Sequence, residues 1–159
     1  MKIVVVGGVA GGMSAAARLR RLKEDADIVV LEAGPEVSFA NCGLPYYVSG
    51  EITDQSALLV QTPESLKSSL NLDARINSTV LSVDPEAKTV VVDGPEGEYE
   101  LEYDELILSP GADAFRPEIK GIDSQRVSTL RTVADALKID EMAKTASSAV
   151  VIGAGFIGL

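Results

Sequence analysis

Apolar runs and one segment of helical character alternate over residues 2–31. Residues 2–6 have the sequence KIVVV and stop at a glycine, residues 13–23 are rich in alanine, leucine and arginine, and residues 27–31 repeat the apolar run. Strands that are apolar throughout are typical of a parallel sheet that is buried on both faces. The pattern therefore predicts a β–α–β unit at the start of the chain.

Shorter elements follow, separated by turn residues. Thr62 offers an N-cap side chain, Pro63 fits a first helical turn and Glu64 is favoured there by the helix dipole, which predicts a helix to about residue 70. Residues 80–83, 89–92 and 99–103 are extended segments separated by the turn sequences DP and DGPEG. This predicts a small antiparallel meander, after which residues 105–109 return as a core strand.

The last part of the chain predicts a helix over residues 131–144 and a strand over residues 149–152 that leads into GAGFIGL. A glycine loop after a strand needs its helix and its neighbouring strands to be stable. We therefore expect the sequence to be the N-terminal part of a longer protein.

The first of two glycine loops follows the first strand in the sequence VVVGGVAGG. Backbone N–H groups of such a loop and the dipole of the next helix can hold a pyrophosphate, and the glycines that permit this are Gly7, Gly8, Gly11 and Gly12. Glu32 ends the second strand, where a carboxylate can accept the hydroxyls of an adenosine ribose. This acid favours a dinucleotide site over a glycine turn that only packs the helix on the strand. Val9 replaces the second glycine of the usual pattern, so Ala10 and Gly11 must approach the phosphates.

The second loop has all three glycines of the pattern G-x-G-x-x-G, namely Gly153, Gly155 and Gly158. Two such loops indicate two dinucleotides, as in electron transfer from nicotinamide to flavin. The expected fold class is α/β: a Rossmann-like domain with a parallel sheet and an inserted antiparallel β-meander, then the first strand and glycine loop of a second Rossmann domain. We place the first domain at residues 1–112, a connecting segment with a helix at 113–147, and the start of the second domain at 148–159.

The amino-acid composition limits which kinds of partner the chain can bind. Fourteen Lys and Arg against twenty-four Asp and Glu give a formal net charge of −10, which disfavours binding to nucleic acid. No apolar run approaches the ~20 residues that cross a bilayer, and no signal-peptide pattern precedes the first glycines. We expect a cytoplasmic protein. The chain has one cysteine and no histidine, so an internal disulfide is impossible and no metal site is expected.

Several motifs together resemble one known group of enzymes. They are GGVAGG, Glu32 at its strand end, SFANCGLPYY, QTPES, LILSPGA and VVIGAGFIG, and they run in order along essentially the whole chain. The sequence resembles the single-cysteine branch of the FAD-dependent pyridine nucleotide-disulfide oxidoreductases, and within it most closely the coenzyme A disulfide reductases. SFANCGLPYY is the most specific of these motifs.

The resemblance implies FAD at the first loop and NADH or NADPH at the second. It also implies a homodimer of the full-length protein. Besides Gly7, Gly11 and Gly12 of the first loop, the flavin contacts that it implies are Ala10, Glu32, Ala33, Asn41, Val80, Ser109, Pro110 and Gly111. Val80 would touch the adenine through its backbone, and residues 109–111 would close over the flavin nucleotide.

Cys42 is the implied redox-active residue. A buried, inert cysteine is the alternative interpretation from composition alone, but Cys42 lies beside Asn41 and precedes GLPYY, a helix start whose dipole favours a thiolate. Relatives with an internal disulfide carry a second cysteine five residues on, where this chain has Tyr47. The oxidised form would therefore be a mixed disulfide with a substrate thiol or a sulfenic acid.

The expected substrate is coenzyme A disulfide or coenzyme A persulfide, whose phosphates need cations. The resemblance places its contacts at Ser14, Arg18, Arg21, Ser38 and Asn41, while a solvated helix face remains an equal alternative for Arg20 and Lys23. Peroxide- and oxygen-reducing relatives carry a histidine where this chain has Ala10, which favours thiol exchange. An NADH oxidase and a non-catalytic flavin-domain fragment remain alternatives, and the choice between NADH and NADPH stays open.

Overall fold

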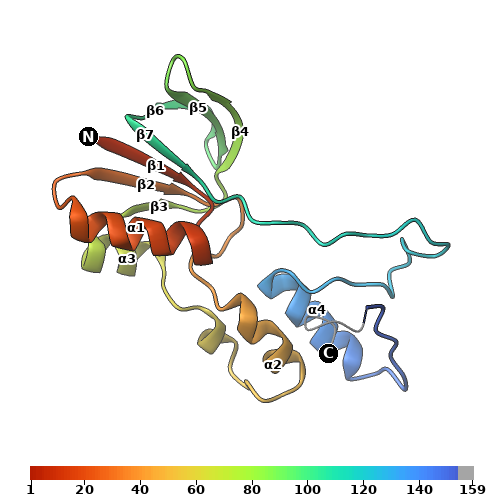
Figure 1. Ribbon diagram of the computed structural model, residues 1–159. Coiled ribbons are helices and arrows are strands. Elements are labelled where there is room, and N and C mark those ends of the chain that lie inside the picture. Colours follow the sequence, from red (N-terminus) through yellow and green to blue (C-terminus); the bar gives the residue numbers. More distant parts are fainter. Residues whose placement is uncertain (154–159) are drawn as a thin grey trace.

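The computed structural model describes residues 1–153, and a four-stranded parallel sheet forms its centre (Figure 1). The strand order is β3-β2-β1-β7, with β1 at Lys2–Val6, β2 at Asp27–Leu31, β3 at Asp73–Arg75 and β7 at Glu105–Leu108. All neighbouring strands in this sheet are parallel. The β–α–β unit predicted from the apolar runs is therefore confirmed, and β1 lies between β2 and β7.

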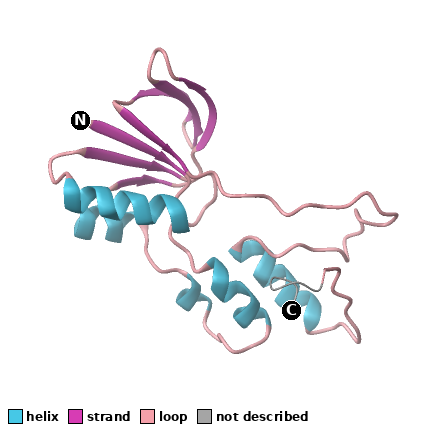
Figure 2. Ribbon diagram, viewed as in Figure 1, coloured by secondary structure: helices cyan, strands magenta, loops and turns pink. Residues whose placement is uncertain are grey.

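Helices cover one face of the sheet and a second sheet covers the other (Figure 2). Helices α1 (Ala10–Leu22) and α3 (Pro63–Leu70) pack on the side chains of alternate strand residues such as Ile3, Val5 and Ile28. The intervening residues, among them Val4 and Val29, face the opposite way onto the antiparallel sheet. Because both faces are covered, these strands are apolar throughout.

The second sheet is the predicted meander. Its strands β4 (Thr79–Asp84), β5 (Thr89–Gly94) and β6 (Gly97–Glu102) pair antiparallel in that order. Alternation along β5 buries Val90 and Val92 against the parallel sheet. The predicted α/β fold with an inserted antiparallel meander is thus confirmed.

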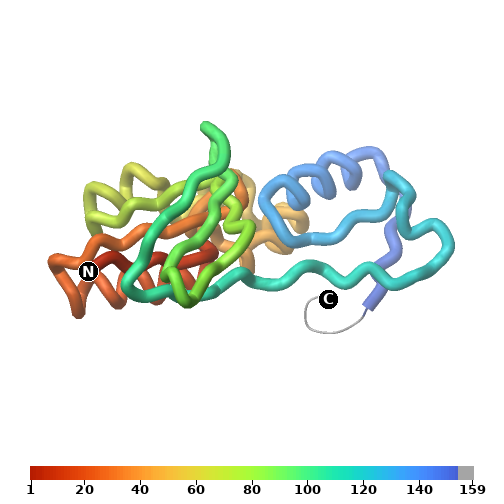
Figure 3. The backbone as a smooth tube through the Cα atoms, turned by 90° about the horizontal axis from the view of Figure 1, so that it is seen from above, coloured from red at the N-terminus to blue at the C-terminus, as the bar shows by residue number. Residues whose placement is uncertain are grey.

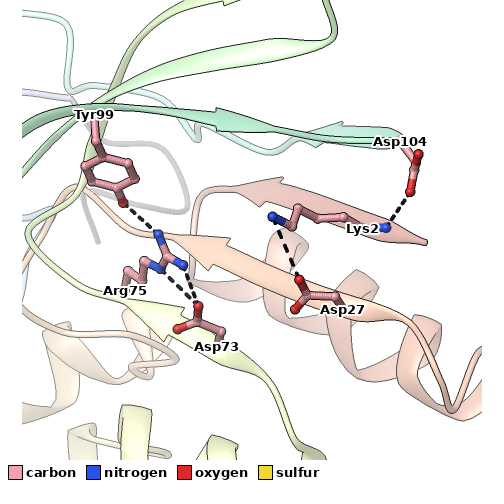
Figure 4. Close-up of polar contacts among 6 residues, drawn as sticks. All are labelled: Lys2, Asp27, Asp73, Arg75, Tyr99 and Asp104. Atoms are coloured by element: carbon pink, nitrogen blue, oxygen red, sulfur yellow. Dashed lines mark hydrogen bonds and ion pairs between the residues drawn. The ribbon is translucent and has the colours of Figure 1, made fainter.

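Polar contacts tie the strands at the edges of these layers (Figure 4). The backbone N–H of Lys2 donates to Asp104 Oδ2 at 2.6 Å, which joins the start of β1 to the turn before β7. The Arg75 guanidinium donates to Asp73 and to the Tyr99 hydroxyl, and it lies 5.6 Å from the centroid of the Tyr99 ring. The hydrogen bond to Asp73, together with the one to Tyr99, raises the pKa of Arg75 above its ordinary value. The Arg75 contacts hold the meander against the end of β3.

The two helices on the outer face are also joined. Thr62 and Ser65 form the capping box that begins α3, as the N-cap prediction required. The Arg20 guanidinium, from the last turn of α1, donates to the carbonyls of Leu70 and Asn71 at 2.8 and 2.9 Å. Arg20 is therefore a structural residue that satisfies the carboxyl end of α3, and the alternative of a merely solvated side chain is wrong.

A helical layer lies beside the carboxyl ends of the parallel strands (Figure 3). It contains the short helices η1 (Asn41–Gly43), α2 (Leu44–Val48) and η2 (Gln55–Leu58), and the longer helix α4 (Val133–Ala143). Residues 109–132 contain no helix or strand and connect β7 to α4 by an extended excursion. Helices α2 and α4 pack together around Leu44, Leu58, Val133 and Ala136.

One predicted element is wrong. Residues 149–152 form no strand, and Val150, Val151 and Ile152 are largely exposed. A strand exists only where its backbone N–H and C=O groups pair with a neighbour, and neither of the sheets in the described part of the chain includes this segment. Helix α1 begins at Ala10, three residues earlier than expected, because the helix starts inside the glycine loop. Gly153 has a positive φ of 104°, while Gly155 and Gly158 lie outside the described residues.

Candidate functional site

A cavity of about 330 Å³ opens where the first glycine loop, the end of β7 and the helical layer meet. Residues from five separate segments line it: Gly7, Val9, Ala10, Gly11, Glu32, Asn41, Ser109, Pro110, Gly111 and Arg131. Ligands of open parallel sheets bind beyond the carboxyl ends of the strands, which is where this cavity lies. Eight of its residues are among the predicted flavin contacts.

The glycine loop passes too close to neighbouring backbone for any side chain. A Cβ atom on Gly7 would lie 2.0 Å from the carbonyl oxygen of Ser109, and one on Gly12 would lie 1.8 Å from the carbonyl oxygen of Gly7. Gly7 also has a φ of 96°, which disfavours other residues. Gly12 therefore brings α1 close to β1, which leaves the first N–H groups of the helix at the wall of the cavity.

Glu32 is held by the loop that it faces. Its Oε2 accepts a hydrogen bond from the Gly8 N–H at 2.6 Å, and its Oε1 accepts one from the Gly34 N–H at 2.8 Å. A carboxylate offers about four lone-pair positions, so about two remain for a ligand. The half-buried Glu32 is thus held in one orientation and keeps acceptor positions that these two hydrogen bonds do not use.

Cys42 lies in η1 and is exposed. The Asn41 side-chain oxygen Oδ1 accepts from the Cys42 N–H at 3.1 Å and from the thiol at 3.7 Å. Helix α2 begins directly after η1. The alternative in which this cysteine is a buried core residue is therefore wrong, and Asn41 connects the thiol to the wall of the cavity.

Ser38 links the cysteine segment to the glycine loop. Its N–H donates to the Gly8 carbonyl oxygen at 2.7 Å, and its φ of 53° is in the left-handed region that non-glycine residues seldom adopt. Because Gly8 donates to Glu32 through its N–H and accepts from Ser38 through its carbonyl oxygen, Glu32 and the cysteine segment are both bonded to this one residue of the glycine loop.

Other predicted residues are not among those that line the cavity. Ser14, Arg18 and Arg21 are exposed and spaced along one side of α1, leading away from the loop. Ala33 is exposed next to Glu32. Val80 pairs with Val92 in the meander and packs against its core, outside the cavity wall.

Two residues of the cavity wall were missed from the sequence: Val9 and Arg131. Val9 is the N-cap residue of α1 and takes the place of the second glycine. Arg131 is half-buried, and its Nε donates to the Ala112 carbonyl oxygen at 2.6 Å. Among the residues described as lining the cavity, Arg131 is the one cation. No local pattern marks it, because it follows an irregular segment and reaches the cavity only through the tertiary fold.

A second cavity, of about 390 Å³, lies under the turn between β5 and β6, against Arg75 and Tyr99. It is the weaker candidate for a functional site, because its wall is mainly apolar and the guanidinium of Arg75 is already paired with Asp73. Among residues 1–153 no group of three or more acidic, cysteine or histidine side chains is arranged to hold a metal. In the same part of the chain, no helix has the length and hydropathy to span a bilayer.

Comparison with known proteins identifies the relatives of this chain. The family model for pyridine nucleotide-disulphide oxidoreductases matches residues 1–159. The coenzyme A disulfide reductase of Staphylococcus haemolyticus (strain JCSC1435) is 38% identical over 162 residues, which cover 99% of this chain and 36% of the relative. The chain therefore spans about a third of the length of that relative.

Two solved structures are similar in sequence and in fold. The structure of reduced Bacillus anthracis CoADR-RHD is 48% identical with a TM-score of 0.87, covering 91% of this chain and 26% of that one. The structure of an NAD-dependent persulfide reductase from A. fulgidus is 43% identical with a TM-score of 0.96, covering 100% of this chain and 30% of that one. Both solved chains are much longer than this one.

Proposed function

We propose, on the premise that this chain belongs to the pyridine nucleotide-disulphide oxidoreductase family, that it forms the flavin-binding part of an NAD(P)H-dependent enzyme. That enzyme reduces coenzyme A disulfide or coenzyme A persulfide through Cys42. The observation that carries the proposal is the exposed Cys42 beside Asn41, which itself lines the glycine-loop cavity. Relatives that carry the same architecture are named for these two reactions.

The residues present fit FAD. The glycine loop gives a pyrophosphate access to backbone N–H groups, because Gly7 and Gly12 leave no room for side chains. Arg131 supplies a positive charge at the same wall, and Glu32 has acceptor positions left for the adenosine ribose. FAD bound there would supply the two electrons, taken from a reduced nicotinamide, that reopen a disulfide at Cys42.

The protein residues do the thiol exchange. The Cys42 thiolate attacks one sulfur of coenzyme A disulfide, a Cys42–S–S–CoA bond forms, and the second coenzyme A leaves as a thiolate. Two electrons then cleave that bond, which restores the Cys42 thiolate and releases the other coenzyme A after proton uptake. Asn41 holds the Cys42 backbone in place through its side-chain oxygen. No second cysteine is needed, because the substrate supplies the other sulfur.

Substrate charge would be met by helix α1. Arg18 and Arg21 are exposed on this helix, which begins at the cavity. Arginine suits phosphate recognition, since its guanidinium offers several donors in a fixed geometry. We assign the phosphates of coenzyme A to this side of α1, with Ser14 and Ser38 nearer the thiol.

Oxidation of NADH by the full-length enzyme that contains this chain tests the proposal under four conditions: with coenzyme A disulfide, with coenzyme A persulfide, with hydrogen peroxide, and with oxygen alone. We expect turnover with one or both coenzyme A substrates and little with the others. Cys42→Ser should abolish this turnover while the flavin stays bound at the same ratio to protein. Rapid oxidation of NADH by oxygen alone, unaffected by coenzyme A disulfide, would favour an NADH oxidase and contradict the proposal. A colourless protein that binds no flavin would favour a non-catalytic module.

A further inference from the structure

Helix α4 packs along the segment that carries Cys42 (Figures 1 and 2). Leu44, two residues after Cys42, is 2% exposed and belongs to one apolar cluster with Val133 and Ala136, which are 1% and 0% exposed. Interiors are close-packed, so a change of one or two methyl groups at such a contact is transmitted to its neighbours. The backbone at Leu44 is therefore fixed against α4.

Cys42 itself is exposed and does not belong to the apolar cluster. Its neighbours supply the constraint: Asn41 accepts from its N–H, and Gly43 lies so close to Leu58 that a Cβ there would be 3.1 Å from Leu58 Cδ2. Leu58 belongs to the same cluster as Leu44 and Ala136. The place of the thiol is thus decided by packing on the residues that follow it.

The same N-terminal end of α4 also reaches the cofactor cavity. Thr132 and Asp135 form a capping box, and Asp135 Oδ2 also accepts from the Arg131 N–H at 3.0 Å. Arg131, immediately before that cap, lines the glycine-loop cavity. A single helix therefore joins a wall of the cavity to the packing beneath Cys42.

We infer that α4 sets the position of Cys42 relative to the cofactor cavity, and that Ala136 is the positioning residue at which this spacing is fixed. The inference rests on the proposed function for the role of Cys42. Ala136 touches no substrate, cofactor or reacting atom in this account. It acts through Leu44, because a larger side chain at a fully buried position must displace the element that it faces.

Ala136→Leu and Ala134→Leu in the flavin-loaded enzyme form a matched pair. Both substitutions add the same side chain to the same helix, but Ala134 is exposed whereas Ala136 is buried. Four readouts are needed: flavin bound per protein, the thiolate-to-flavin charge-transfer absorbance, the rate at which iodoacetamide alkylates Cys42, and the steady-state kcat and KM.

We expect Ala136→Leu to keep its flavin, to lose the charge-transfer absorbance, to change the alkylation rate, and to lower kcat on the order of 10- to 100-fold with KM for the nicotinamide unchanged. Ala134→Leu should match the unsubstituted enzyme in all of these. If a folded, flavin-loaded Ala136→Leu variant had the same charge-transfer absorbance, alkylation rate and kcat as Ala134→Leu, the inference would be wrong.

Val133→Ala gives the same test if Ala136→Leu does not fold, because it removes two methyl groups from the same cluster. It should accelerate alkylation of Cys42, and an unchanged rate would contradict the inference. Failure of the proposed function gives a different result. In that case Cys42→Ser would retain full turnover and the unsubstituted enzyme would show no charge-transfer absorbance, while the alkylation rates would still report on positioning.

Discussion

Gly12→Ala tests whether close packing of α1 on β1 builds the cofactor cavity. A methyl group at Gly12 would lie 1.8 Å from the Gly7 carbonyl oxygen and 3.1 Å from Val5 Cγ1, and the first of these is backbone that cannot rotate away. Helix and loop must separate by about 1 Å before that contact reaches the 3.0 Å that Cβ atoms tolerate. Overpacking of this kind costs about 1–3 kcal/mol, and we take the upper end because the obstacle is backbone.

The expected loss of about 3 kcal/mol corresponds to a fall in Tm of roughly 6–12 °C for a domain of this size. Circular dichroism during heating measures it, and flavin absorbance of the purified protein should fall with it. Gly11→Ala is the matched control, since the nearest atoms to its methyl group would be those of the Ser109 side chain, at 3.6 and 3.7 Å. Its Tm should be unchanged or slightly raised, because alanine favours a helix by about 0.5–1 kcal/mol over glycine. Equal Tm values for the two variants would refute the packing argument.

Three further predictions concern binding and pH. Arg131→Gln should weaken flavin affinity by about 10-fold, as expected for a lost charge-assisted contact worth roughly 1.4 kcal/mol or more, and titration with FAD followed by fluorescence would measure it. Replacing both Arg18 and Arg21 by Gln should raise KM for coenzyme A disulfide but leave KM for pantethine disulfide, which lacks the adenosine and its phosphates, unchanged. The hydrogen bond from Ser56 lowers the pKa of Asp54. The stability that Asp54 lends to η2 is therefore present above its unfolded pKa and is lost as the pH falls through its folded pKa. NMR titration should give the Asp54 carboxyl a pKa below its usual range, and Ser56→Ala should raise that pKa.

Much of the fold was predictable because the residues that favour an element locally are also the residues that the tertiary structure buries or caps. The strands at residues 2–6 and 27–31 are apolar throughout, and the sheet that forms buries them on both faces. The turn sequences between the three meander strands correctly predicted where those strands end, and Thr62 correctly predicted the start of α3. In each case the residues that form an element also carry its local signal.

Elements and residues that depend on distant partners were not predictable in this way. The apolar residues 149–152 have a strand-like composition but no paired neighbour in the described part of the chain, so composition alone gave the wrong element. Arg131 lacks any motif and reaches the cavity through the long connection after β7. Arg20 could be interpreted as a solvated side chain until the fold placed it on the end of α3.

The proposed function depends most on one covalent bond, between Cys42 and coenzyme A. Intact-protein mass spectrometry after incubation with coenzyme A disulfide, without reduced nicotinamide, measures it directly, and peptide mapping locates it. We predict one coenzyme A attached to Cys42, complete release of it when NADH or NADPH is added to the flavin-loaded enzyme, and no adduct in Cys42→Ser. An enzyme that turns over coenzyme A disulfide without ever carrying this adduct would contradict the account.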